Sequence, residues 1–273
     1  MNGFLVNKLT DRVTQITDPA NVFCFLVQGT DAAVLIDTGT GLKGLRKLVE
    51  ELTDLPVSVV LTHGHGDHAG GVGEWPKVYL HPADRGMIGE HGMEMRMGYA
   101  AAMMGPDANL TEEMFVPVPG ADTEIADLFD GQIFPLGGAQ LEVVQVPGHT
   151  RGSCCMLLRV ERSILYGDAC NVNTLVSGEE STTISEYRQS LLRLKTFDDA
   201  YDTVYYSHGA PVGPRQCLED NIELCDRILA GTDDAVPDNF LGRTAFRAAK
   251  MDGQYRRLDG KFGNIVYSER TKK

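Results

Sequence analysis

The chain has 273 residues, of which 42% are hydrophobic, so it can bury the core of one large domain or two small ones. Its formal net charge of −13 argues against nucleic acid or an anionic membrane as a partner. The start of the chain has no basic and apolar leader, and no apolar run is long enough to span a membrane. We therefore expect a cytoplasmic protein that binds neither nucleic acid nor membrane.

The six cysteines lack CxxC spacing, which in a reducing compartment predicts buried free thiols.

The first 36 residues are dominated by short β-type runs. Because the connections are short, we expect these runs to pair as antiparallel strands. The predicted strands are Phe4 to Val6, Val13 to Thr17, Val22 to Gln28 and Ala32 to Ile36.

A GxGxxG pattern at residues 39–44 follows the last of these strands and opens a predicted helix, Leu42 to Leu52. Taken alone, it would suggest a dinucleotide phosphate loop. However, the next strand ends at Thr62 and His63, where a dinucleotide-binding unit would place an acidic residue for the ribose. We interpret the glycines instead as a turn that lets Asp37 point at a metal site.

The strongest feature of the sequence is a run of possible metal ligands after the apolar strand Val57 to Leu61. Imidazole and carboxylate groups suit zinc, and also iron or manganese. A single histidine at a strand end is usually an ordinary surface or core residue. Three histidines and one aspartate with a small residue in each gap are hard to explain in that way. The candidate ligands are His63, His65, Asp67 and His68.

Three later polar residues also follow β-type runs and stand beside glycine: His149, Asp168 and His208. Each lies just past the end of a predicted strand, so strand ends could bring all seven candidates to one edge of the fold. His81 could be a ligand by residue type, but we interpret it as a residue that ends the strand Lys77 to Leu80.

Residues 86–115 contain seven of the ten methionines. We expect this stretch to be helical, and two interpretations stay open. It is either a helix packed on the core, in which methionine fills gaps, or a flexible apolar lid over the metal site.

The second half of the chain continues the alternation of strands and helices. A capping box at Thr183 and Glu186 predicts the start of a helix that ends near Phe197. A second helix is predicted from Pro214 to Leu229. The predicted strands are Met114 to Val118, Thr123 to Ala126, Gln132 to Phe134, Leu141 to Val146, Ser153 to Val160, Ser163 to Tyr166 and Thr203 to Tyr206.

Two halves, roughly residues 1–115 and 116–273, each contain strands followed by helices. This pattern predicts an α/β (α+β) fold, a four-layer αββα sandwich in which two mixed sheets lie face to face with helices on both outer faces. Residues 232–273 form a C-terminal extension that carries a net charge of +3. Within it we predict a hairpin of Gln254 to Leu258 and Phe262 to Ser268 around Asp259. Its cations are either solvated or bind an anionic group of a substrate.

The order HxHxDH, His, Asp, His resembles the ligand order of the metallo-β-lactamase superfamily. The resemblance extends over most of the chain and implies that residues 1–273 form a single domain of this fold. Asp37 resembles the early aspartate of that family, which supports the ligands. The resemblance implies one metal held by His63, His65 and His149, a second held by Asp67, His68 and His208, and Asp168 bridging the two. It also implies that Asp67 orients the nucleophile during catalysis.

The same resemblance implies two divalent metal ions, with Zn²⁺ the first choice and Mn²⁺ or Fe as alternatives, and a metal-bridging hydroxide as nucleophile. The family's antibiotic-hydrolysing members carry cysteine where Asp168 stands, whereas a carboxylate resembles glyoxalase II-type thioesterases, lactonases and phosphodiesterases. We therefore predict a hydrolase of a small ester, thioester or lactone.

Several alternatives stay open. One is a persulfide dioxygenase-like oxidoreductase with a single iron. Others are a phosphodiesterase for a small anionic substrate and a non-catalytic binding protein. The sequence is compatible with a homodimer but does not determine the oligomeric state.

Overall fold

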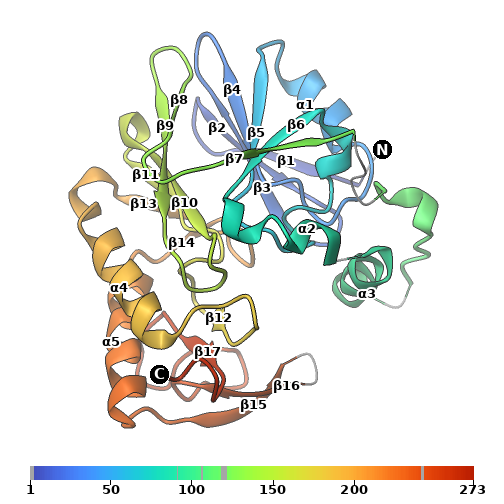
Figure 1. The fold of residues 1–273 in the computed structure, drawn as a ribbon. Helices are drawn as coiled ribbons and strands as arrows, with labels where there is room; N and C mark the ends of the chain where they lie inside the picture. Colours follow the sequence, from blue (N-terminus) through green and yellow to red (C-terminus); the bar gives the residue numbers. More distant parts are fainter. Residues whose placement is uncertain (1–2, 91, 106, 118–121, 241–242) are drawn as a thin grey trace. The chain divides into compact units, whose positions relative to one another are not determined.

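The computed structural model of the chain describes residues 3–90, 92–105, 107–117, 122–240 and 243–273 (Figure 1). The chain divides into two compact units. The first comprises Met1–Val143 and the short return segment Ser207–Pro211, and the second comprises Val144–Tyr206 and Val212–Lys273. The division therefore lies later in the chain than the position near residue 115 that the sequence suggested.

The first unit is built on a seven-stranded sheet whose strands are adjacent in chain order, β1 to β7 (Figure 1). The first four strands are antiparallel, as predicted, and β4 to β7 are parallel. The strands are β1 (Leu5–Lys8), β2 (Val13–Thr17), β3 (Phe23–Gln28), β4 (Ala33–Ile36), β5 (Val57–Val60), β6 (Lys77–Leu80) and β7 (Glu124–Asp127).

The parallel pairing of β4 with β5 decides where the polar loops of this unit emerge. Ile36 is paired with Val60, the last residue of each strand. The segments that begin at Asp37 and at Leu61 therefore leave the sheet side by side at the same edge.

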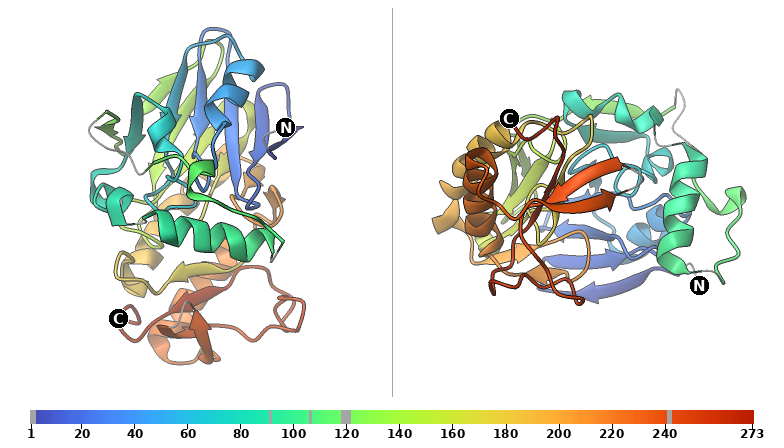
Figure 2. Two further views of the ribbon diagram at one scale, coloured as in Figure 1. Left: turned by 90° about the vertical axis from the view of Figure 1, so that its right-hand side faces the viewer. Right: turned by 90° about the horizontal axis from the view of Figure 1, so that it is seen from below.

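The helices α1 (Leu45–Leu52), α2 (Met87–Glu90) and α3 (Met93–Met104) accompany this sheet. Both views of Figure 2 show α3 as a separate helix at the periphery of the first unit. One of its faces packs through Met93, Met97 and Ala100 against Leu42 and Phe115. On the rest of the helix Met95, Met103 and Met104 are exposed. The prediction of helix in the methionine-rich stretch is thus correct for α2 and α3, while movement as a lid stays a prediction.

Strand β9 (Gln140–Gln145) begins in the first unit and ends in the second. It pairs with β8 (Ile133–Pro135). Its sheet has the order β14-β13-β11-β10-β9-β8, and a separate four-stranded sheet has the order β12-β17-β16-β15. The remaining strands are β10 (Cys154–Leu158), β11 (Ser163–Leu165), β12 (Thr174–Val176), β13 (Thr203–Tyr205), β14 (Val212–Gly213), β15 (Val236–Phe240), β16 (Arg243–Arg247) and β17 (Ile265–Tyr267).

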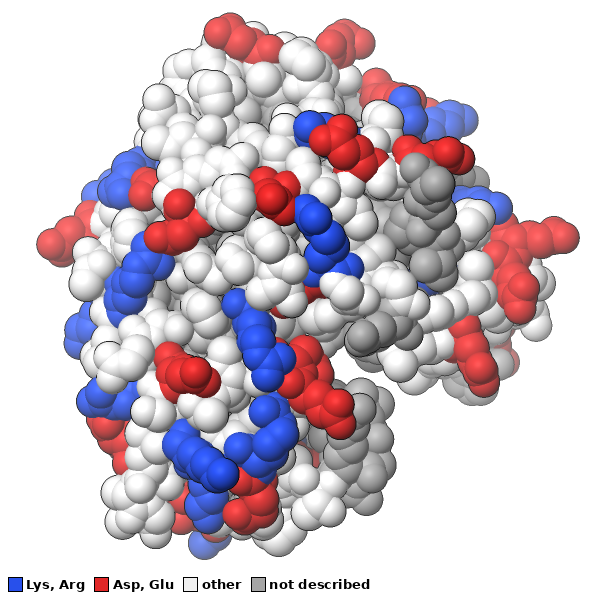
Figure 3. Space-filling model, viewed as in Figure 1, with Lys and Arg blue, Asp and Glu red and all other residues white. Residues whose placement is uncertain are grey.

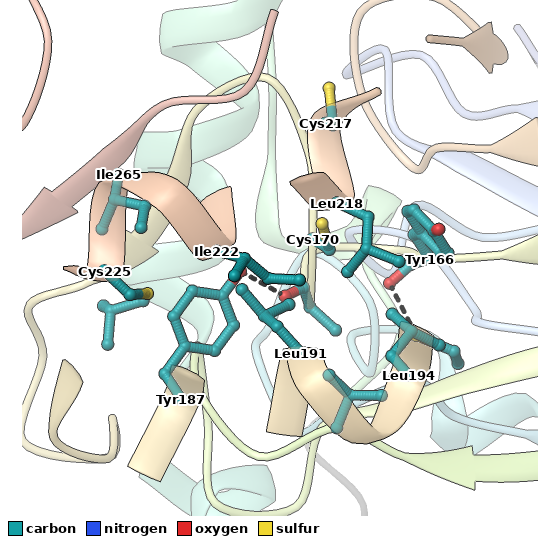
Figure 4. Close-up of a cluster of buried hydrophobic side chains, with 14 of the residues drawn as sticks. Tyr166, Cys170, Tyr187, Leu191, Leu194, Cys217, Leu218, Ile222, Cys225 and Ile265 are labelled. Atoms are coloured by element: carbon teal, nitrogen blue, oxygen red, sulfur yellow. Dashed lines mark hydrogen bonds between the residues drawn. The ribbon is translucent and has the colours of Figure 1, made fainter. Parts of the chain in front are cut away.

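Helices α4 (Ile184–Lys195) and α5 (Cys217–Ala230) form the helical part of the second unit. Figure 4 shows their apolar side chains facing one another, among them Tyr187 and Leu191 of α4 and Ile222 of α5. The predicted capping box at Thr183 and Glu186 is present at the start of α4. Together with the mixed sheets, these helices confirm the predicted α/β class.

Some predictions for the C-terminal extension were wrong. Within the described residues, the segment 254–258 forms no strand, and only an isolated bridge joins Met251 to Arg257. Strand β17 forms instead by pairing with β12 and β16, which are distant in sequence. The predicted strand Met114 to Val118 is also absent over its described residues, where Phe115 makes one bridge to Leu42.

The cations of the C-terminal extension are largely engaged with neighbouring acids. Arg247 binds Asp238 at 2.6 Å, and Arg257 binds Asp259. On the face shown in Figure 3, Lys and Arg side chains lie next to Asp and Glu. This pairing favours the solvated-surface interpretation of the extension over an anion-binding role.

All six cysteines are buried and free, as predicted. In the part of the chain that the structure describes, no helix is both long and apolar enough to cross a membrane.

Candidate metal centre

Four candidate ligands of the first unit lie on the loop that follows β5, and hydrogen bonds join this loop to the loop after β4. Thr38 donates from its main-chain N (2.7 Å) and its hydroxyl (2.9 Å) to the carbonyl of His68. The main-chain N of Gly70 donates to the carbonyl of Gly39 at 2.9 Å. We call residues 62–71 the metal loop and residues 37–41 the aspartate loop.

The GxGxxG pattern serves this contact between the two loops. A Cβ at Gly41, whose φ is +87°, would lie 2.3 Å from the carbonyl oxygen of Gly70. Any side chain at position 41 would therefore push the loops apart. This geometry agrees with the interpretation of the glycines as a turn that supports the metal site.

Asp37 makes hydrogen bonds to two residues of the metal loop, Thr62 and His68. It is fully buried and has a positive φ of 64°, which aspartate tolerates better than most residues. Its carboxylate accepts from the main-chain N (2.7 Å) and the hydroxyl (2.8 Å) of Thr62. Its Oδ2 also lies 2.9 Å from Nδ1 of His68. A carboxylate can only accept here, so the proton is on Nδ1 and the lone pair of His68 is on Nε2.

Three donor atoms face one another at the surface of this loop: Nε2 of His68, Nε2 of His208 and Oδ2 of Asp67. The two nitrogens are 3.1 Å apart, and the carboxylate oxygen lies 3.6 Å from His68 and 3.5 Å from His208. In a tetrahedral zinc site with bonds of about 2.0–2.1 Å, neighbouring ligand atoms are about 3.3 Å apart. The triangle therefore fits a divalent cation of this size. Asp67, His68 and His208 form one of the groups of side chains that could hold a metal ion.

His208 reaches this triangle from the return segment of the first unit. The preceding carbonyl of Ser207 accepts from the main-chain N of Phe23 at 2.9 Å, which fixes the segment to the start of β3. This contact was not predicted from the sequence, because it joins residues far apart in the chain.

His63 and His65 form a second pair of facing donors in the first unit. Nε2 of His63 lies 2.9 Å from Nδ1 of His65. The other ring nitrogen of His63 lies 3.0 Å from the hydroxyl of Thr62, which itself donates to Asp37. The hydroxyl oxygen thus accepts from Nδ1 of His63 and leaves the lone pair on Nε2. Thr62 is a supporting residue whose role was not predicted from the sequence, although it stands directly before the motif.

The other two predicted ligands belong to the second unit. His149 is buried, and its Nδ1 lies 2.7 Å from the carbonyl oxygen of Leu175, which assigns the proton to Nδ1 and the lone pair to Nε2. Asp168 follows β11, and its Oδ2 lies 3.8 Å from Nε2 of His149. Asp168 and His149 are therefore neighbours, and the ring of His149 has the orientation that a ligand histidine needs.

His81 has a structural role, as predicted from the sequence. Its Nδ1 accepts from the main-chain N of Ala83 at 3.2 Å and caps the short helical turn Pro82–Asp84. Burial lowers the pKa of His81 below its ordinary value of 6.5, which keeps the ring neutral and able to accept this bond.

A family model described as the metallo-beta-lactamase superfamily matches residues 17–208, which include all seven predicted ligands. The chain belongs to the metallo-β-lactamase superfamily. It is a hydrolase of this superfamily, and its His and Asp groups indicate binding of divalent metal. The number and the identity of the ions remain predictions.

Several relatives of this superfamily member are named as thioesterases. The acyl-coenzyme A thioesterase MBLAC2 of Homo sapiens is 28% identical over 201 residues, which cover 68% of this chain and 71% of the human protein. The atrochrysone carboxyl ACP thioesterase of Claviceps purpurea (strain 20.1) is 27% identical over 220 residues, covering 76% of this chain and 59% of the fungal protein.

Among solved structures, a metallo-beta-lactamase from Pontibacter korlensis matches with a TM-score of 0.59 and 20% identity, over 82% of this chain and 99% of that one. This likeness shows the fold.

Proposed function

We propose that the chain is a metal-dependent thioesterase that hydrolyses acyl thioesters of a small thiol or of a carrier protein. The observation that carries the proposal is the donor triangle of Asp67, His68 and His208, with His68 oriented by the buried carboxylate of Asp37. The thioesterase activity in the names of the human and fungal relatives supports this substrate class.

We assign the seven ligands to two sites. His63, His65 and His149 would hold one divalent cation, and the triangle would hold the second. Asp168 would bridge them. When bound, such a pair would supply a Lewis acid for the carbonyl and lower the pKa of a coordinated water to about 7.

The residues of the chain have distinct tasks in this scheme. Three of the histidines have a hydrogen-bond partner at Nδ1 and would present Nε2 to a metal ion, and they are His63, His68 and His149. Asp67 would accept a proton from the attacking water. The water oxygen forms a bond to the thioester carbon, the C–S bond breaks, and the leaving sulfur would take up the proton held by Asp67, so that the products are a carboxylate and a thiol.

The experiment is hydrolysis of acyl-coenzyme A thioesters of several chain lengths, followed by release of the thiol, together with the metal content of the purified protein. All six cysteines of the chain are buried, so they contribute little to a thiol assay. Three variants test the site: Asp67→Asn, His208→Ala and Asp168→Ala. We expect each to lose at least about a hundredfold in kcat/KM, as expected for groups of one catalytic unit.

His81→Ala is the matched control, because it removes a histidine that contacts a main-chain N rather than a metal ligand. It should keep the metal content and most of the activity. Thioester hydrolysis at the wild-type rate in Asp67→Asn and Asp168→Ala would contradict the proposal.

A second activity has to be measured beside the first, because two imidazoles and one carboxylate are also the ligand set of non-heme iron oxygenases. Iron at one atom per chain, with oxygen uptake in the presence of a persulfide and no thioester hydrolysis, would replace the proposed function by the dioxygenase. Turnover of lactones or phosphodiesters without turnover of thioesters would retain the metal centre and change the substrate class.

A further inference from the structure

Helix α3 places a buried arginine beneath the metal loop. Only 3% of Arg96 is exposed, although it lies in a helix whose other face is open to solvent. Its guanidinium stacks on the ring of Phe115 at 5.9 Å and donates to main-chain carbonyl oxygens. Burial lowers the pKa of Arg96, the direction expected for a cation removed from water.

The carbonyl partners of Arg96 come from three separate segments of the first unit. Nη1 donates to Gly70 in the metal loop at 2.8 Å and to Thr40 in the aspartate loop at 3.4 Å. Nη2 donates to Val116 at 2.9 Å. Val116 in turn donates from its main-chain N to the carbonyl of Gly41 at 2.7 Å. One side chain therefore joins the two loops that carry Asp37 and the first ligands.

We propose that Arg96 is a positioning residue of the metal centre, and that α3 contributes to metal binding by carrying it. The inference rests on the proposed metal site. Gly70 lies two residues after His68, and its main-chain N is held by Gly39, two residues after Asp37. By holding the carbonyl of Gly70, Arg96 fixes the spacing between the carboxylate of Asp37 and the ring of His68.

Arginine suits this position for a physical reason. A buried cation without hydrogen bonds would be strongly destabilising, and the planar guanidinium can direct several N–H groups at fixed angles. Lysine carries the same charge, but its ammonium is a point charge on a flexible stem and cannot keep the fork geometry. The conservative change should therefore lower metal affinity as well.

The experiment measures zinc affinity by competition with a chromophoric chelator, and thermal unfolding of the metal-free protein, for Arg96→Met and Arg96→Lys. Groups that orient ligands typically change affinity by about 10- to 100-fold. We expect at least a tenfold loss in Arg96→Met and a smaller loss in Arg96→Lys.

Arg46→Met is the matched control. Arg46 also donates to a main-chain carbonyl, that of Glu74 at 3.0 Å, and lies over the ring of Trp75 at 5.9 Å, but it contacts neither the metal loop nor the aspartate loop. We expect this variant to lose some stability and to bind zinc as the wild type does.

The outcomes are distinct. If Arg96→Met unfolds at a lower temperature without metal but binds zinc with wild-type affinity, Arg96 only stabilises the fold and the inference is overturned. If Arg96→Met yields no folded protein, Arg96→Lys provides the test. Wild-type zinc affinity in Arg96→Lys would then overturn the inference. If the wild type binds no divalent metal, the proposed metal centre itself fails, which is a separate result.

Discussion

Replacement of Asp37 by asparagine tests how the metal loop is organised. Asparagine has nearly the same shape and also tolerates the positive φ at this position, so the backbone should be retained. In the wild type one carboxylate oxygen accepts from the main-chain N of Thr62 and the other faces Nδ1 of His68. An amide that still accepts from Thr62 presents its NH₂ group to His68. His68 must then move its proton to Nε2, the atom that faces the metal position.

The size of the effect follows from the bond that is lost. A hydrogen bond to a charged group contributes about 1.5–3 kcal/mol, and 1.4 kcal/mol corresponds to about a tenfold change in a binding constant. We therefore expect zinc affinity at the Asp67, His68 and His208 site to fall by about 10- to 100-fold. This range also agrees with the usual effect of changing the carboxylate partner of a ligand histidine.

Zinc affinity and stoichiometry are measured by chelator competition for Asp37→Asn and for a control, Asp220→Asn. Asp220 is a buried carboxylate of the second unit that accepts from the main-chain N of Phe262 (2.7 Å) and Gly263 (3.0 Å). The control should be destabilised and keep its zinc affinity. Wild-type affinity in Asp37→Asn, within about twofold, would refute the assignment of Nε2 of His68 as a ligand atom.

Two further predictions concern the surroundings of the site. In Gly148→Ala the new Cβ would lie 2.1 Å from the ring of Tyr187, so overpacking should cost about 1–3 kcal/mol in thermal or denaturant unfolding. Combination with Tyr187→Leu should recover part of that loss, and strict additivity of the two changes would count against the clash. For His81, the folded-state pKa lies below the ordinary value of 6.5, so its contribution to stability is complete above that pH and declines as the pH falls. Denaturant unfolding of the wild type and of His81→Asn, which can still cap but does not titrate, should show the wild type losing stability relative to the variant below about pH 6.5. A pH-independent difference would contradict this.

Local sequence was sufficient for features that depend on neighbouring residues. The capping box at Thr183 and Glu186 was predicted because both of its hydrogen bonds join residues three positions apart. The metal loop was recognised because its candidate ligands lie within six residues, directly after a β-branched strand. The role of His81 at a strand end was also correct, since the capped turn begins at the next residue.

Other features were decided by contacts between distant segments. β17 forms because it lies between β12 and β16, whereas the predicted hairpin partner at residues 254–258 has no such neighbours among the described residues. The two faces of α3 could not be separated from composition, because methionine occurs on both. Only the packing of Met93 and Met97 beside Leu42 and Phe115 distinguishes them.

The sequence by itself determined which residues can bind metal and the family to which the chain belongs, because ligand type and spacing are local properties. The tertiary structure decided which ring nitrogen carries the lone pair in His63, His68 and His149. That choice depends on the carboxylate of Asp37, the hydroxyl of Thr62 and the carbonyl of Leu175, and two of these lie more than 25 positions from the ring they orient. It also decided that Arg96 lies beneath the metal loop, because a buried guanidinium requires carbonyl groups that only the folded chain brings together.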